Sequence, residues 1–284
     1  MSLEGDACSC CNEMVPYNVD NCPKGSFVGF PNVRVARKMK ADLAGRHTAA
    51  REAGDTRNVS DLIQRLDDLL NGAKASINLA PRIVANLANG QPYRSYHESC
   101  DLGQRPLAKR INHAHRTAVD AKVHIGYGDR IINAALSPDG RGLSNYGKIA
   151  LLLKDGAISD RCSLLSENAF DYFQSHKLWD PDKPEPLGFR ALWEDRAALG
   201  VAKLEPLVKE NMSDEDLCDL ILHSGADRHD DRYIEVHVID FLQREYVGSF
   251  YRARAFDQDE AKLWTSIVEK LTAEGAKELT AAND

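Results

Sequence analysis

The chain has 284 residues, an apolar fraction of 43% and a formal net charge of −7. This length fits one large domain or two smaller ones, and the composition is ordinary for a protein that buries a hydrophobic core. Acidic and basic residues are interspersed, so the sequence lacks the dedicated basic surface with which proteins displace counterions from nucleic acid. A small ligand that carries phosphate needs only one or two cations and is compatible with this charge.

Membrane association is not expected from the sequence. No stretch approaches the ~20 consecutive apolar residues that a membrane-spanning helix needs. The first residues have neither the basic start nor the apolar core of a signal peptide. We therefore expect no membrane partner and a cytoplasmic location in the producing cell, with export by a route that reads no such signal as the alternative.

Residues 1–33 combine three prolines with Cys8, Cys10, Cys11 and Cys22 and show no lasting periodicity. We expect an irregular segment here. The chain has seven cysteines, and an odd number at scattered positions does not suggest a disulfide framework. The four early cysteines are close enough to bind zinc, but they lack a clean second C-x-x-C pair. We favour a loosely ordered tail with free thiols over a zinc site and assign no metal ligands.

Residues 34–120 are expected to form a mostly helical region. Apolar residues at helical spacing follow Ser60, a suitable N-cap, and stop at Gly72. Similar patterns predict helices at 77–87 and 106–119.

Residues 121–284 form a third region, in which short runs of β-forming residues appear. The sequence predicts strands at 123–127, 131–136, 147–153, 233–239 and 248–252. It predicts helices at 190–211, 213–225 and 260–271. Strands confined to one part of the chain and interrupted by a helical insertion indicate an α+β fold with a mostly antiparallel sheet.

The segment 145–170 is the most informative part of the sequence. It joins a buried strand to a polar segment that carries Arg161 and Ser163. A guanidinium group can bind phosphate through two hydrogen bonds, and a hydroxyl can bond to an amide or a ribose. The alternative is an ordinary exposed strand pair in which Arg161 balances Asp160. A thiol nucleophile at Cys162 lacks a recognisable third group.

Glu235 is a carboxylate within an otherwise apolar strand. Alternation along the strand places it on one face with Tyr233 and His237. If this face lines a cleft, a partly desolvated carboxylate is suited to base or electrostatic catalysis. If the face is exposed, Glu235 is the polar side of an amphipathic strand. The polar loop 224–232 before this strand is either a solvated connection or a segment that recognises an acceptor.

Taken together, these segments resemble ADP-ribosyltransferases of the bacterial toxin and phage-associated type. In that family a Tyr-Gly strand precedes an Arg-x-Ser/Thr segment, and a later strand supplies the catalytic glutamate. The pair 146–147, the segment 161–163 and the triplet 233–235 match these elements in the same order. The resemblance covers residues 123–254 and implies an ADP-ribosyltransferase-like fold for 121–284, with NAD as a substrate.

The resemblance implies two catalytic residues. Glu235 would stabilise the positive charge that builds on the ribose when the glycosidic bond of NAD breaks. Ser163 would orient Glu235 or the ribose. Arginine-modifying members carry Glu or Gln two positions before the catalytic glutamate, where this chain has Tyr233, so we do not expect arginine as the acceptor.

The resemblance also implies five residues that bind NAD. Arg161 belongs to the segment that packs at the nicotinamide end. His124 or Arg130 would hold the ribose or the phosphates, and Tyr127 or Tyr146 would stack on nicotinamide.

Two functions of different classes remain. The first is an NAD-dependent ADP-ribosyltransferase, a toxin or effector that modifies a protein or another macromolecule. The second is a non-catalytic binding module, in which the helical region docks a partner and the strand domain is a scaffold. The enzyme predicts that Glu235, Ser163 and Arg161 meet at one cleft, whereas the scaffold predicts that they are dispersed or solvated.

Overall fold

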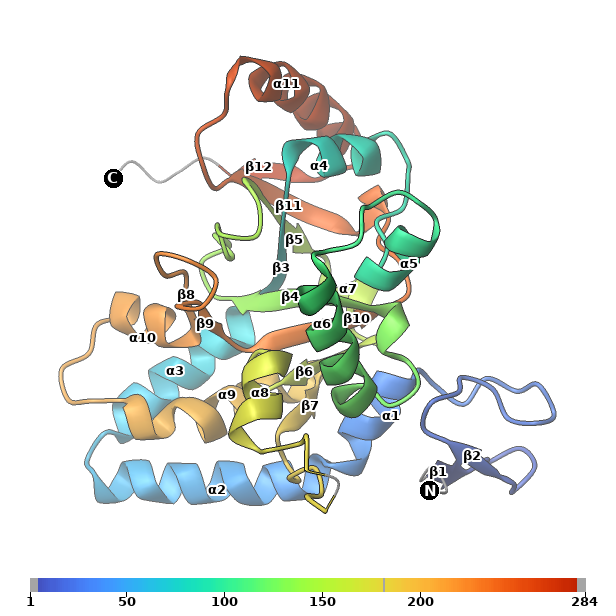
Figure 1. Cartoon of the computed structure of the whole chain (residues 1–284). Coiled ribbons are helices and arrows are strands. Elements are labelled where there is room, and N and C mark those ends of the chain that lie inside the picture. The colour runs from blue at the N-terminus through green and yellow to red at the C-terminus, as the bar shows by residue number, and fades with distance from the viewer. Residues whose placement is uncertain (1–4, 181, 280–284) are drawn as a thin grey trace.

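A computed structural model describes residues 5–180 and 182–279 of the chain (Figure 1). The fold is α+β, and within these residues the main sheet has eight strands. All neighbouring strands of this sheet are antiparallel except β11 and β12, which are parallel. In sheet order the strands are Lys277–Leu279 (β12), Val247–Arg252 (β11), Ile149–Leu153 (β5), Lys74–Leu79 (β3), Ile131–Ser137 (β4), Glu235–Ile239 (β10), Cys162–Leu165 (β6) and Arg190–Leu192 (β7).

The two faces of the sheet differ in chemistry because side chains alternate across each strand. One face packs into the main hydrophobic core with residues that include Ala75, Ile77, Ile132, Ala134, Leu151, Leu164, Val236 and Val238. The strand register places a polar set on the opposite face, namely Ser76, Asn78, Asn133, Ser163, Glu235 and His237. Only one face of the sheet is apolar, so the opposite face can provide polar side chains for a site. We call this second face the polar face.

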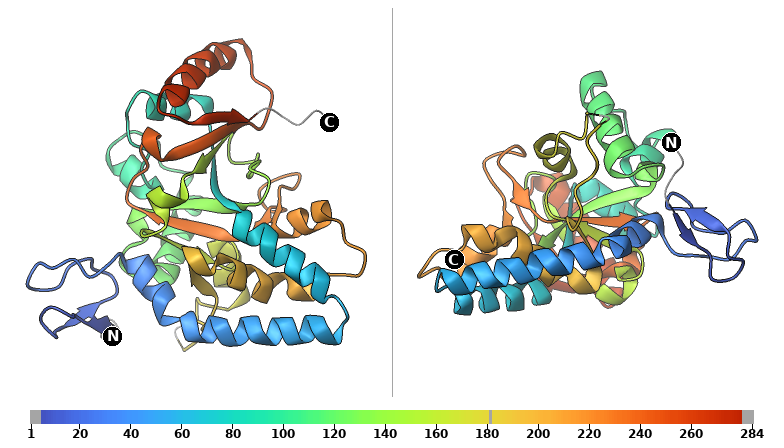
Figure 2. Two further views of the ribbon diagram at one scale, coloured as in Figure 1. Left: turned by 180° about the vertical axis from the view of Figure 1, so that it is seen from behind. Right: turned by 90° about the horizontal axis from the view of Figure 1, so that it is seen from below.

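Several of the helices pack against the apolar face of the sheet and complete the main core. The helices are Pro31–Lys38 (α1), Lys40–Thr56 (α2), Ser60–Gly72 (α3), Pro81–Ala88 (α4), Tyr96–Asp101 (α5), Arg110–Val123 (α6), Asp155–Ile158 (α7), Ala169–Ser175 (α8), Arg196–Leu204 (α9), Asp214–Ile221 (α10) and Gln258–Ala273 (α11). Leu66 of α3, Leu199 of α9 and Leu271 of α11 are fully buried in this core. Figure 2 shows α2 crossing the molecule in front of the sheet when it is seen from below.

A second, smaller core forms on the polar face. Val119 and Val123 of α6 pack there with Tyr172 of α8 and with Leu165, which the register places beside Glu235. Helices α6 and α8 therefore cover part of the polar face. No helix among the described residues is both long and apolar enough to cross a membrane.

The predicted helix at 77–87 is confirmed from Pro81 onward by α4 and is wrong at its start. Residues 74–79 form β3, which lies between β5 and β4, and α4 begins at Pro81. The sequence Ala-Ser-Ile-Asn-Leu at 75–79 alternates with a period of two, as a strand does, and Pro81 favours the first turn of a helix. The region 34–120 is therefore not wholly helical, because it supplies a central strand of the sheet.

Three further expectations need correction. Residues 123–127 form no strand, because α6 continues to Val123 and a turn follows. The predicted helix at 190–211 begins as the strand β7 before α9 starts at Arg196. The N-terminal segment, expected to be irregular, contains one short antiparallel hairpin, in which Gly5–Ala7 (β1) pairs with Met14–Pro16 (β2).

Other predicted elements are confirmed. Strands β4, β5, β10 and β11 overlap the runs predicted at 131–136, 147–153, 233–239 and 248–252, and α11 includes 260–271. Helix α10 lies within the predicted range 213–225 and begins with a capping box formed by Ser213 and Asp216. A short two-stranded sheet, Leu222–His223 (β8) with Arg232–Tyr233 (β9), closes the loop that leads into β10.

Candidate functional site

A cavity of about 730 Å³ lies on the polar face. Asn78 of β3, Asn133 of β4 and Glu235 of β10 line it from the sheet. Residues of α5, α6 and the start of α8 line it from the helices, and Arg228 lines it from the loop before β10. This volume is within the range of cavities that hold small-molecule ligands.

Glu235 is the buried carboxylate of this cavity, with 2% of its surface exposed. Its Oε2 accepts a hydrogen bond of 2.7 Å from the backbone N–H of Ala169, at the start of α8. The same oxygen lies 3.1 Å from Nε2 of His237, which donates to it when the carboxylate is ionised. Two neighbouring groups thus fix the orientation of the carboxylate.

A buried polar cluster lies next to Glu235. His237 is fully buried, and the ring of His124 meets it edge to face at 4.3 Å between centroids. Ser163 is opposite His237 in the register of β6 and β10. The Ser163 hydroxyl and both ring nitrogens of His124 have no hydrogen-bond partner among the described residues. Ser163 and His124 therefore lie close to Glu235 but outside the described lining of the cavity.

Burial lowers the pKa of His124 well below its ordinary value, and the nearby His237, Arg190 and Arg116 add to this effect. His124 is therefore a neutral imidazole at physiological pH. A neutral ring suits a buried position near the cationic side chains of Arg190 and Arg116.

Two tyrosines border the cavity on the side of the loop 224–232. Tyr146 and Tyr233 both line the cavity, and the Tyr233 hydroxyl accepts a bond of 2.9 Å from Nδ2 of Asn168. The guanidinium of Arg228 lies 4.7 Å from the centroid of the Tyr146 ring. Burial, and then the charge of Glu235, raise the pKa of Tyr233 well above its usual value. Both phenols therefore stay protonated.

Four arginines line the cavity, namely Arg94, Arg105, Arg116 and Arg228. Two of them stack on one aromatic ring, since Arg105 lies 5.0 Å and Arg116 4.8 Å from the centroid of Tyr96. Among the described lining residues the only carboxylates are Asp120 and Glu235. The cavity therefore combines an excess of positive charge with one deeply buried carboxylate.

Besides Ser163 and His124, three further predicted site residues lie outside the described lining of this cavity. Arg161 donates 3.1 Å hydrogen bonds to the main-chain carbonyls of Ile239 and Phe241. Arg130 forms ion pairs with Asp20 at 2.6 Å and Asp240 at 2.7 Å.

Tyr127, the third of these residues, packs in a small apolar cluster with Ile131 and Ile239, and burial raises its pKa to about 12. The structure thus brings Glu235 and Tyr146 to the cavity and places Ser163 and His124 outside its described lining. Arg161 is not at this cleft.

The thiol of Cys162 has no access to the cavity. Cys162 is fully buried in the main hydrophobic core, on the apolar face of the sheet, and burial raises its pKa. The thiol stays protonated and shielded from substrates, so it is unsuited to nucleophilic catalysis.

The sequence interpretation missed Tyr96, Arg105 and Arg116. The cluster of basic residues between 105 and 116 is compatible with an anion-binding segment. Nothing in the local sequence indicates that this segment folds over the polar face. Arg228 lies in the loop 224–232, which was considered for acceptor recognition and which the structure places at the cavity.

A scan of the sequence against protein-family models finds no match, and a search of curated proteins finds none either. A function for this chain therefore has to be inferred from its motifs and from the geometry of the cavity.

Proposed function

We propose that the cavity binds NAD and that Glu235 assists the transfer of ADP-ribose from NAD to a macromolecular acceptor. In this reaction the bond between ribose C1′ and the nicotinamide nitrogen breaks, and nicotinamide leaves with the electron pair. A nucleophilic group of the acceptor forms the new bond to C1′ and loses its proton to Glu235 or to water.

The observation that carries the proposal is the position of Glu235. Positive charge develops on the ribose as nicotinamide departs, and a carboxylate held in advance beside that charge stabilises it more in the transition state than in the ground state. The bonds from Ala169 and His237 hold the carboxylate in place before substrate arrives. Its burial reduces screening by water and strengthens the interaction.

The arginines and tyrosines support the choice of NAD as ligand. Arginine binds phosphate oxygens through paired hydrogen bonds. The lining has four arginines, of which Arg94 is ion-paired with Glu98. The candidates to bind the two negative charges of a pyrophosphate are the other three, Arg105, Arg116 and Arg228. Tyr146, 37% exposed, offers a ring on which a nicotinamide or adenine can stack.

A ligand-binding module without catalysis is the second candidate. The placement of Arg161 favours it, because this guanidinium is bonded to main-chain carbonyls and is not directed to the cleft, as an NAD-binding role would require. In that case the cavity would bind an anionic ligand and leave its bonds intact.

The decisive experiment compares wild type with Glu235→Gln, which keeps the side-chain shape and removes the charge. We expect wild type to release nicotinamide from NAD and to transfer label from NAD to a component of a cell lysate. Glu235→Gln should lower the rate by about 100-fold or more. Glu167→Gln is the matched control, because Glu167 is outside the described cavity lining and bonds to Ser175.

Nicotinamide release that is unchanged in Glu235→Gln would contradict the catalytic proposal. A thermal-shift titration separates the two candidates, because NAD at 100 times its dissociation constant stabilises the folded state by about 2.7 kcal/mol. Stabilisation by NAD without any cleavage would support the binding module.

A further inference from the structure

The N-terminal hairpin has an unusually small interior. Figure 1 shows β1 and β2 at the side of the molecule, near α1. The buried residues of this module, residues 5–28, are Cys8, Val15 and Cys22, with Cys11 and Val28 packed against them. Three of these five residues are cysteines. Folded segments of this size seldom obtain enough stability from apolar burial alone and usually need a metal or disulfides.

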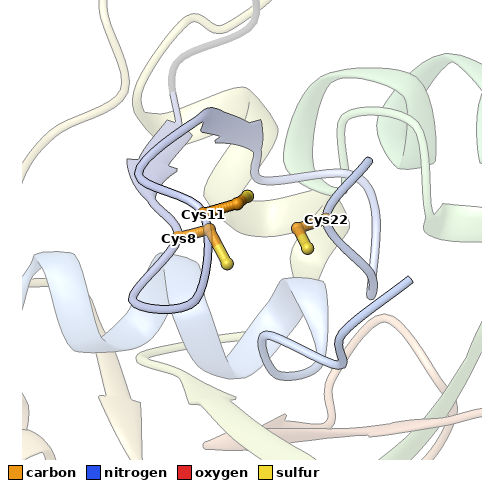
Figure 3. A group of neighbouring side chains, drawn as sticks. All are labelled: Cys8, Cys11 and Cys22. Atoms are coloured by element: carbon orange, nitrogen blue, oxygen red, sulfur yellow. The ribbon is translucent and has the colours of Figure 1, made fainter. Parts of the chain in front are cut away.

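The three cysteines face one another. Their Sγ atoms all lie within 4.8 Å of each other, and Figure 3 shows Cys8 and Cys11 extending from one loop toward Cys22 on the facing loop. Sulfurs bound to a tetrahedral zinc at about 2.3 Å are about 3.8 Å apart, so only a small contraction is needed to bind the ion.

Each loop makes a tight turn at its cysteine. The N–H of Asn12 donates to the carbonyl of Cys8, four residues earlier, and the N–H of Gly25 donates to the carbonyl of Cys22, three residues earlier, each at 2.8 Å. Asn12 and Gly25 both have positive φ, which ends each turn. The N–H of Cys10 points at Sγ of Cys8 at 3.3 Å, a contact that stabilises a thiolate. These turns direct the thiols inward and supply an N–H donor to sulfur.

We propose that Cys8, Cys11 and Cys22 bind one Zn²⁺ ion that stabilises the N-terminal module. Thiolate ligands favour zinc over magnesium or calcium. No other Cys, His, Asp or Glu belongs to this group among the described residues, so a water molecule completes the tetrahedron. Cys10 is exposed and is not a ligand.

The module is also tied to the rest of the protein. Arg34 of α1 is buried and donates to the carbonyls of Val15 at 2.6 Å, Pro16 at 2.9 Å and Val19 at 3.0 Å. Arg130 bonds to Asp20 of the module and to Asp240, directly after β10. Zinc that orders the module therefore also orders the partners of Arg34 and Arg130.

The test measures the zinc content of the full chain purified under reducing conditions, by elemental analysis. We expect one zinc per chain and loss of the metal in Cys8→Ser, Cys11→Ser and Cys22→Ser. Cys100→Ser is the matched control, because Cys100 is a free, partly exposed thiol outside the module. Cys10→Ser should keep the metal, and its loss there would overturn the three-thiolate set.

A second measurement does not depend on the folding of variants. Cobalt(II) added to chelator-treated, reduced wild type should give thiolate charge-transfer absorption and the visible bands of a tetrahedral ion. Absence of these bands together with absence of zinc would overturn the proposal. So would a disulfide between any two of the three cysteines in the native protein, detected by alkylation without reductant and mass spectrometry.

Discussion

At the scale of single residues, the carboxylate of Glu235 depends on a buried histidine pair. His237 bonds to Glu235, and the ring of His124 packs against His237, while neither ring nitrogen of His124 has a hydrogen-bond partner among the described residues. A buried polar group without a partner costs about 1–3 kcal/mol. The protein tolerates this cost at the place where it also holds its candidate catalytic group.

The neutral state of His124 predicts a pH dependence of stability. Its pKa in the folded protein is well below the value of about 6.5 in an unfolded chain, so the unfolded chain binds the proton more tightly. The contribution of His124 is thus fully present above about pH 6.5 and is lost as the pH falls, with a slope of up to about 1.4 kcal/mol per pH unit. We expect His124→Phe to flatten this slope.

Urea denaturation at about pH 7.5 and at about pH 5 measures the change in the free energy of unfolding. His229→Phe is the control, because it makes the same replacement at an exposed position. An equal slope in wild type and His124→Phe would show that His124 is not the group that titrates.

At the scale of secondary-structure elements, Gly147 explains why a Tyr-Gly pair precedes β5. A Cβ at this position would lie 2.3–2.5 Å from the backbone of Leu79, at the end of β3. Backbone atoms cannot move aside as a flexible side chain can. The glycine therefore permits the close approach of the chain before β5 to β3, whatever the function of the fold.

Replacement of Gly147 by alanine should force these two segments apart and lower the free energy of unfolding by about 1–3 kcal/mol. Denaturant unfolding measures this loss. Gly72→Ala is the matched control, because a Cβ at Gly72 meets no atom within 4 Å and the residue is at the end of α3. That change should be neutral or stabilising. If both substitutions change the free energy of unfolding by the same small amount, the proposed close approach of Gly147 to the backbone of Leu79 is contradicted.

Arg116 of helix α6 brings a positive charge to the cavity. The effect of this local charge on ligand binding can be separated from the effect of the protein's net charge. Arg116 lines the cavity, whereas Lys122 is an exposed cation of the same helix outside the described lining. A charge-assisted hydrogen bond contributes about 1.5–3 kcal/mol, so Arg116→Gln should weaken NAD binding by about tenfold or more. Lys122→Gln removes the same charge and should change affinity little. Calorimetric titration with NAD measures both, and equal losses would indicate only a long-range effect of charge.

At the scale of the whole molecule, the sheet joins parts of the chain that the sequence interpretation assigned to different regions. Leu66 and Leu70 of the expected helical region lie in the same core as Leu151 and Phe250 of the expected strand domain. Strand β3 lies between β5 and β4, which both come later in the chain. The polar face that carries Glu235 is therefore continuous across the boundary expected near residue 120.

Several features were determined by the sequence itself, because their signals are local. The apolar run at 149–153 specifies a buried strand, Ser213 and Asp216 specify the start of α10, and alternation places Glu235 and His237 on one face of β10. Each of these depends on residues a few positions apart. For the same reason, Glu235 could be singled out before its surroundings were known.

Only the tertiary structure decided what surrounds Glu235. It brought Arg116 and Tyr146 to the cavity, turned Arg161 toward main-chain carbonyls and gathered Cys8, Cys11 and Cys22 around one point. These placements depend on the pairing of distant strands and on the packing of helices over one face of the sheet. Such contacts leave no periodic pattern in the local sequence, because the residues that make them are far apart along the chain.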